Sequence, residues 1–283
     1  MTGTRHLLNI LPGVSATDGA GVQLTRMVGT AQLNMLDPFL MLDCIDSEDL
    51  DRYIAGFPNH PHRGFETVTI MLDGLMRHKD SVGNDGLLRP GDVQWMTAGS
   101  GIIHSEIPEM VNGKLRGFQL WVNLPSEKKM MPPAYQDIPS AVIPTAHFDG
   151  GIARVIAGSY FGIEGPAKGQ IPIRILDVGL KPYEEWRVDT TSGNELFTCV
   201  YDGTIESDNK RGNRCTAEAP AIILFEGNGD VIVAAGRGGA NILYCEGRPI
   251  NEPVVKYGPF VMNTREEVQR AVEDFNSGRL VNV

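Results

Sequence analysis

Short apolar runs alternate with turn residues along most of this chain, and this pattern is typical of strands. It extends from about Leu24 to Leu124 and again from Ile152 to about Tyr244, with Gly, Pro, Asn and Asp between the runs. Such close spacing favours antiparallel barrels or sandwiches, so we expect an all-β fold with two copies of one architecture. The clearest expected strands in the first region are Thr67–Leu72, Asp92–Met96, Ile102–Ile107 and Arg116–Val122.

A proline-rich segment separates the two strand-rich regions. Between Pro125 and Pro144 the chain carries five prolines and several charges, a composition that the interior of a sheet does not accommodate. With 283 residues the chain is also long enough for two hydrophobic cores. We therefore expect two tandem domains, at residues 1–130 and 131–283.

The C-terminal end has a different periodicity. Thr264 and Glu267 fit a capping box, and the apolar residues that follow recur at helical spacing. Gly278 suits the end of a helix. The pattern predicts one amphipathic helix over Arg265–Ser277, within the second domain, that packs on the body of the protein.

Composition excludes several classes of protein. The net charge of −10 and the pI near 5.1 argue against direct nucleic-acid binding, which needs clustered Lys and Arg. No apolar run has the length of a signal peptide or a membrane span, so we expect a soluble, cytoplasmic protein. The four cysteines lie far apart, which indicates reduced thiols instead of a disulfide scaffold or a thiolate zinc site.

The most informative feature is two pairs of metal-binding side chains, each separated by one residue. His60 and His62 form the first pair, and His104 and Glu106 form the second. In a strand, residues i and i+2 point to the same face, about 7 Å apart, and neighbouring strands lie roughly 4.8 Å apart. Two such strands side by side would gather three imidazoles and a carboxylate around one point. The spacing therefore predicts a mononuclear metal site.

A second carboxylate is a further candidate. If the chain stays extended from His60 to Leu72, Glu66 shares a face with both histidines of the first pair. Gly64 permits a bulge, so the register before Glu66 is open. Glu66 is then an alternative ligand or an acid/base, while Glu106 is preferred as ligand because it shares a strand with His104. The other histidines, His6, His78 and His147, are interpreted as structural.

The types of ligand limit which metal ions the site could bind. Imidazole and carboxylate ligands without thiolate suit Fe(II), Mn(II), Ni(II), Zn(II) or Cu(II). Four protein ligands in an octahedral field leave two positions for water, substrate or dioxygen. An open, redox-capable site favours Fe(II). No histidine follows His147, so only the first domain is expected to bear a metal.

Four sequence motifs resemble those of the pirin family of the cupin superfamily. They are Gly56–Thr69, Pro90–Glu106, Leu120–Pro125 and Gly258–Thr264. The resemblance implies two cupin, or jelly-roll, barrels and assigns metal binding to the positions of His60, His62, His104 and Glu106. The broader cupin pattern instead uses an acid just beyond the first histidine pair, which is Glu66 here.

The resemblance also implies a function. Pirins resemble quercetin 2,3-dioxygenases in their metal chamber, so we expect Fe(II)-dependent cleavage of a small, flavonol-like aromatic by O2. Either Glu66 or Glu106 would accept the proton of the substrate hydroxyl. Phe57, Phe65, Trp95 and Met96 are candidates to line the entry, with core packing as the simpler interpretation. The alternative is a metal- or redox-sensing regulatory protein that binds a transcription factor or a metabolic enzyme.

Overall fold

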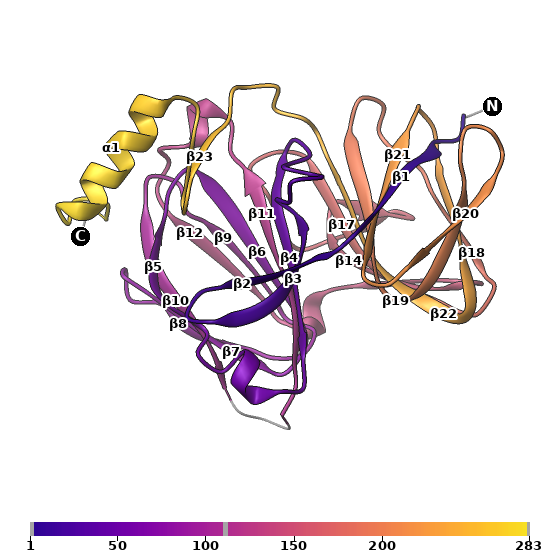
Figure 1. Cartoon of the computed structure of the whole chain (residues 1–283), viewed down its shortest axis with the longest axis horizontal. Coiled ribbons are helices and arrows are strands. Elements are labelled where there is room, and N and C mark those ends of the chain that lie inside the picture. The colour runs from indigo at the N-terminus through magenta and orange to yellow at the C-terminus, as the bar shows by residue number, and fades with distance from the viewer. Residues whose placement is uncertain (1–2, 110–112, 282–283) are drawn as a thin grey trace. The chain divides into compact units, whose positions relative to one another are not determined.

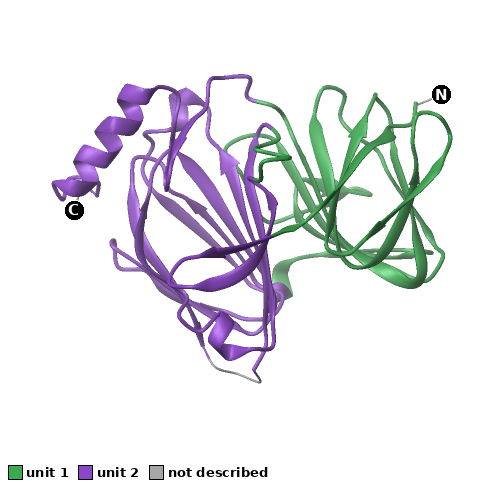
Figure 2. Cartoon of the chain, in the orientation of Figure 1, with its two compact units in different colours: residues 1–14, 30–36, 141–249 green, residues 15–29, 37–140, 250–283 purple. Residues whose placement is uncertain are grey.

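Two compact units make up the structure, a computed structural model that describes residues 3–109 and 113–281 (Figure 2). Their bounds differ from the expected ranges 1–130 and 131–283, because each end of the chain belongs with the opposite half. Within the proline-rich segment, the chain passes between the units after Ser140. Unit 1 comprises residues 1–14, 30–36 and 141–249, and unit 2 comprises residues 15–29, 37–140 and 250–283.

Unit 2 contains two antiparallel sheets (Figure 1). The four strands expected from the sequence are all present; three extend by one or two residues at one or both ends, and the fourth is shifted by one residue, to Val93–Thr97. The seven-stranded sheet has the order β12 (Ala134–Ile138), β9 (Val93–Thr97), β6 (Phe65–Asp73), β11 (Leu115–Asn123), β4 (Phe39–Ser47), β3 (Val22–Val28) and β2 (Val14–Asp18). The four-stranded sheet has the order β5 (Phe57–His62), β10 (Ile102–Glu109), β7 (Leu75–Asp80) and β8 (Asp85–Leu88).

Apolar residues from both sheets pack together at one end of unit 2. Met71 on β6, Met76 on β7 and Leu115 on β11 belong to this cluster, and each is at most 3 % exposed. β6 is rich in β-branched and aromatic residues, which suits a pleated, buried surface. The cluster fills part of the interior between the two sheets.

The C-terminal segment also belongs to unit 2. It forms a hairpin of β23 (Val255–Tyr257) and β24 (Phe260–Met262) and then α1 (Arg265–Asn276), drawn in yellow in Figure 1. The expected helix and its capping box are confirmed: the Thr264 side chain accepts from the backbone N–H of Glu267, whose carboxylate accepts from the backbone N–H of Thr264. The helix belongs to the unit that carries both pairs of candidate ligands, whereas the sequence placed it in the second expected domain.

A buried lysine joins this segment to the strand connection beside His62. Lys129 is 1 % exposed, and its three N–H groups donate to the carbonyl oxygens of Gly64 and Val261 and to Oδ1 of Asn123, at 2.8 to 2.9 Å. Burial lowers the pKa of Lys129 to about 8. All three donors of the ammonium are satisfied, so the charge is tolerated inside the protein.

Replacing Lys129 with methionine is expected to lower the free energy of unfolding by about 2–3 kcal/mol, because three buried oxygens lose their donor. Chemical denaturation would measure the change. The matched control is Lys79→Met, since the Lys79 side chain is 57 % exposed and its partner Asp85 lies at the surface. Equal stability of the two variants would show that the lysine does not brace this connection.

Unit 1 is built on one nine-stranded antiparallel sheet, in which the N-terminal strand pairs with β21. Its interior is filled by apolar side chains, including Trp186, Tyr244 and Leu176, each at most 1 % exposed. The strands of the sheet are β1 (His6–Pro12), β13 (Thr145–Phe148), β14 (Gly151–Ala157), β17 (Ile173–Leu180), β18 (Glu185–Val188), β19 (Glu195–Asp208), β20 (Arg214–Glu218), β21 (Ala221–Glu226) and β22 (Val231–Gly247).

The remaining elements are short. A small hairpin joins β15 (Ser159–Tyr160) to β16 (Ile163–Glu164), and three 3-10 turns occur at Leu50–Arg52, Ser126–Lys128 and Ser140–Val142. No helix within the described ranges is long and apolar enough to cross a membrane. All four cysteines are free thiols. The all-β class with a C-terminal helix is confirmed.

Candidate metal centre

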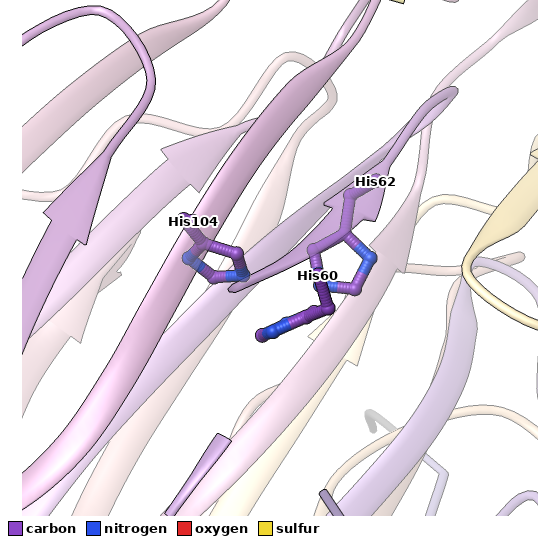
Figure 3. Close-up of side chains that lie close together, drawn as sticks. All are labelled: His60, His62 and His104. Carbon is purple, nitrogen blue, oxygen red and sulfur yellow. The ribbon is translucent and has the colours of Figure 1, made fainter. Parts of the chain in front are cut away.

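The two pairs of candidate ligands lie on adjacent antiparallel strands of unit 2. His60 on β5 is directly opposite His104 on β10, and His62 is opposite Ile102. One ligand atom from each of the three histidines lies within 4.8 Å of those of the other two, and the ring centroids are 4.3 to 4.9 Å apart (Figure 3). The register thus brings together the three imidazoles that the sequence predicts as ligands.

Burial keeps two of these rings neutral. Loss of hydration holds the pKa of His62 and of His104 well below the usual range, and neighbouring imidazoles lower both further. Neutral imidazole has the free lone pair that a metal requires. His60 is half-buried, and its Nδ1 lies 2.8 Å from the Pro58 carbonyl, a contact that makes Nδ1 the donor and leaves Nε2 free to bind.

Buried ring nitrogens that lack hydrogen-bond partners also indicate a metal site at these histidines. Nδ1 of His62 and both ring nitrogens of His104 have no hydrogen-bond partner in the part of the chain that the structure describes. Such orphaned atoms are costly unless something else satisfies them. A divalent cation among the three rings would do so, and these donors fit it. Across residues 3–109 and 113–281 this is the one group of its kind, and it lies in unit 2.

Glu106 faces the same interior as His104 but stands apart from the three rings. The alternating burial of β10 places Ile102, His104 and Glu106 on one face, as the sequence predicts. The Glu106 carboxylate lies 3.1 Å from the hydroxyl of Thr69 and 3.2 Å from Nε2 of Gln119, both on the opposite sheet. These two contacts hold the carboxylate in place, and its binding to a metal stays a prediction.

Glu66 lies on the other face of its strand, so the expected shared face is wrong. Thr69 points at Glu106, and residues three apart on a strand point to opposite faces. Glu66 instead accepts a hydrogen bond of 2.8 Å from Thr97 and is fully buried. This places it away from the interior that holds the histidines, which argues against its role as a ligand or as the base.

Glu66 lies on the other face because the chain breaks between β5 and β6. Gly64 has φ of +90°, and a Cβ on it would lie 2.0 Å from the carbonyl oxygen of Val261. The chain turns there and enters a different sheet, so parity does not carry over from His62 to Glu66. Only glycine meets both conditions, the positive φ and the close approach of the C-terminal strand.

A polar layer crosses the seven-stranded sheet beneath the site. Its six members are direct cross-strand neighbours, and hydrogen bonds join several of them. In order across the sheet they are Arg26, Asp43, Gln119, Thr69, Gln94 and Asp137. The sequence did not reveal this layer, because it depends on the register of six strands.

His78, interpreted from sequence as structural, lies beside the site. It is directly opposite Glu106 on β7, its ring is 5.2 Å from that of His104, and it is 1 % exposed. Neither of its ring nitrogens has a hydrogen-bond partner among the described residues. The sequence did not place His78 beside the site, because its position depends on the pairing of β7 with β10.

An open chamber of about 580 Å³ adjoins the histidines. This is within the range of small-molecule sites, about 300–1,000 Å³. Its lining combines Trp121 and Phe57 with His60, His62 and Glu106. Among the residues proposed for the entry, only Phe57 lines the chamber directly. Phe65 packs against His62 and Trp121, at 5.0 and 4.3 Å between ring centroids, while Trp95 is fully buried.

Family comparisons agree with the motifs. The Pirin family model matches residues 21–122, and the model described as the Pirin C-terminal cupin domain matches residues 175–281. A pirin-like protein of Caulobacter vibrioides is 45 % identical over 278 residues, covering 97 % of this chain and 99 % of the relative. A protein of Pseudomonas aeruginosa, whose name gives quercetin 2,3-dioxygenase as a provisional activity, is 42 % identical and covers 99 % of each chain.

Solved structures share the fold. A quercetin 2,3-dioxygenase from Acinetobacter baumannii superposes with a TM-score of 0.88 at 34 % identity, covering 98 % of this chain and 99 % of the other. A bacterial pirin from Escherichia coli in complex with nickel(II) gives a TM-score of 0.65 at 19 % identity, over 85 % of this chain and 99 % of the other. The second likeness concerns the fold alone.

Proposed function

The chain belongs to the pirin family of the cupin superfamily, and from this premise we propose that its chamber is the active site of a metal-dependent dioxygenase. The substrate class is a flavonol-like aromatic, which is cleaved by O2. The observation that carries the proposal is the convergence of three histidines, with buried and unpaired ring nitrogens, at the edge of an open chamber. The names of the relatives from Pseudomonas and Acinetobacter support it.

His60, His62 and His104 hold the metal, with Glu106 as the fourth ligand. Fe(II) suits this donor set, and Mn(II), Ni(II), Zn(II) and Cu(II) are also compatible with it. The bound metal supplies a template for substrate and dioxygen and a path for electrons between them.

The protein contributes orientation and proton transfer. Glu106, held by Thr69 and Gln119, accepts the proton of the substrate hydroxyl, because it is the carboxylate of the two candidates that faces the chamber. Trp121 and Phe57 provide the apolar surface for the rings of the substrate. Leu24 and Ile45, which belong to the apolar cluster between the sheets, extend this apolar surface.

Oxygen uptake with quercetin would test the proposal. Iron-loaded protein is expected to consume O2 and quercetin in equal amounts and to release carbon monoxide, while metal-free protein does neither. Loading with Mn(II), Ni(II), Zn(II) or Cu(II) in parallel identifies the metal that supports turnover. Uptake no faster in any loaded form than without metal would reject the dioxygenase.

A further inference from the structure

A buried ion pair forms part of the chamber wall, away from the histidines. Arg26 on β3 binds Asp43 on β4 through two hydrogen bonds, Nε to Oδ1 at 2.8 Å and Nη2 to Oδ2 at 2.7 Å. Nη2 also donates to Oδ2 of Asp18 at 2.9 Å. All three residues line the same chamber as His60 and His62. A ligand in the chamber could therefore contact these three side chains.

The three side chains are held in position, but they do not use all of their hydrogen-bonding capacity. The Asp43 side chain is 3 % exposed and takes up the bidentate contact, whereas those of Arg26 and Asp18 are 24 % and 51 % exposed. Nη1 of Arg26 has no hydrogen-bond partner among the described residues. The Asp18 carboxylate accepts from Arg26 and from the backbone N–H of Gly19, and a carboxylate has about four acceptor sites. A donor and an acceptor thus remain available side by side.

The side-chain charges at the Arg26 end of the chamber disfavour anions. Its lining contains three carboxylates, those of Asp18, Asp43 and Glu106, and one cation, Arg26. Two of the carboxylates already pair with that cation. Lys256 lies near Arg26, but it is not among the lining residues, and its amine approaches the carbonyl of Leu40 at 3.4 Å. At this end of the chamber, a carboxylate or sulfonate on a ligand would meet the carboxylates of Asp18 and Asp43, and Arg26 already pairs with both.

The distance across the sheet separates this cluster from the metal centre. Gln119, which contacts Glu106, is opposite Asp43, and Asp43 is opposite Arg26. Two strand spacings are roughly 10 Å. Trp121 and Met41 flank this polar row on one side, and Ile45 flanks it on the other. The chamber wall therefore has a polar row that leads from Glu106 to Arg26 between apolar side chains, which fits an aromatic ligand with polar groups at both ends.

We propose that Asp18, Arg26 and Asp43 form a specificity subsite that binds a vicinal diol on the ring of the substrate remote from the metal. One hydroxyl donates to Asp18, and the other accepts from Nη1 of Arg26. The subsite rejects aromatics that carry a carboxylate or a sulfonate on that ring. This assignment rests on the proposed function, because it takes the other end of the ligand to lie at the histidines.

Calorimetric titration of iron-loaded protein without oxygen would measure binding apart from turnover. Quercetin has the vicinal diol, kaempferol has a single hydroxyl on the same ring, and quercetin 5′-sulfonate adds an anion. Wild-type protein is expected to bind quercetin about tenfold tighter than kaempferol, the effect of one hydrogen bond to a charged group. It is expected to bind the sulfonate at least about tenfold more weakly than quercetin.

Asp18→Asn is expected to reduce both ratios to less than about threefold, because the acceptor loses its charge while the side chain keeps its shape. The matched control Asp51→Asn removes an exposed charge that does not line the chamber, and it should leave both ratios unchanged. Equal affinities for the two flavonols in wild-type protein, or ratios that Asp18→Asn does not alter, would overturn the subsite. If Asp18→Asn reduced both affinity ratios but the wild-type protein consumed no oxygen, the subsite would be supported and only the dioxygenase activity would be rejected.

Discussion

Replacement of His104 by alanine is expected to abolish metal retention and to lower oxygen-dependent turnover by more than about 100-fold. His104 is central to the candidate centre: it is directly opposite His60, and its ring lies 4.9 Å from that of His62. Loss of residues that merely orient ligands costs about 10–100-fold in metal affinity or activity, so loss of a ligand should cost more. Metal content after gel filtration and oxygen uptake would measure the two effects.

The control for this variant is His147→Ala. His147 is exposed and lies in unit 1, so its loss should change neither metal content nor turnover. Because His104 is buried, alanine leaves a cavity, and the conservative variant His104→Gln separates loss of the ligand from loss of packing. A folded His104 variant with full metal content would show that the histidines do not form the centre.

The second expected result is a difference between two isosteric changes at buried carboxylates. Glu106→Gln is expected to lower metal affinity about 10–100-fold and turnover by more than about 100-fold, because Glu106 faces the chamber. Glu66→Gln is expected to retain both within about threefold, since Glu66 points to the other face and bonds Thr97. Metal titration and steady-state kinetics on both variants would measure the difference.

This pair also decides between the two ligand patterns considered from the sequence. Each substitution keeps the size of the side chain, and thermal denaturation would verify that both variants are folded. If Glu66→Gln lost the metal while Glu106→Gln kept it, the face assigned to Glu66 would be wrong, and the broader cupin pattern would hold in this chain.

Local sequence patterns predicted what a single strand or helix determines. His104 and Glu106 share a face because β10 is continuous through both residues. The helix α1 follows from a capping box and helical periodicity within a few residues. In both cases the signal lies within one element, so distant contacts did not alter it.

Distant contacts decided what the sequence did not reveal. The parity from His62 to Glu66 failed because the Val261 carbonyl of the C-terminal segment approaches Gly64. The domain bounds differed for a related reason, since strand pairing joins β1 to β21 and the C-terminal segment packs in unit 2. Likewise, the contacts of Glu106 with Thr69 and Gln119 join two different sheets.

The central claim is that one metal ion is held by His60, His62 and His104 in unit 2 and that unit 1 holds none. Diffraction data collected at the absorption edge of the bound metal, from crystals of protein purified without added metal, would test it most directly. We expect one anomalous peak per chain, about 2.0–2.2 Å from a nitrogen of each histidine. A peak beside Glu66, in the apolar interior of unit 1 or anywhere else outside the chamber would contradict it.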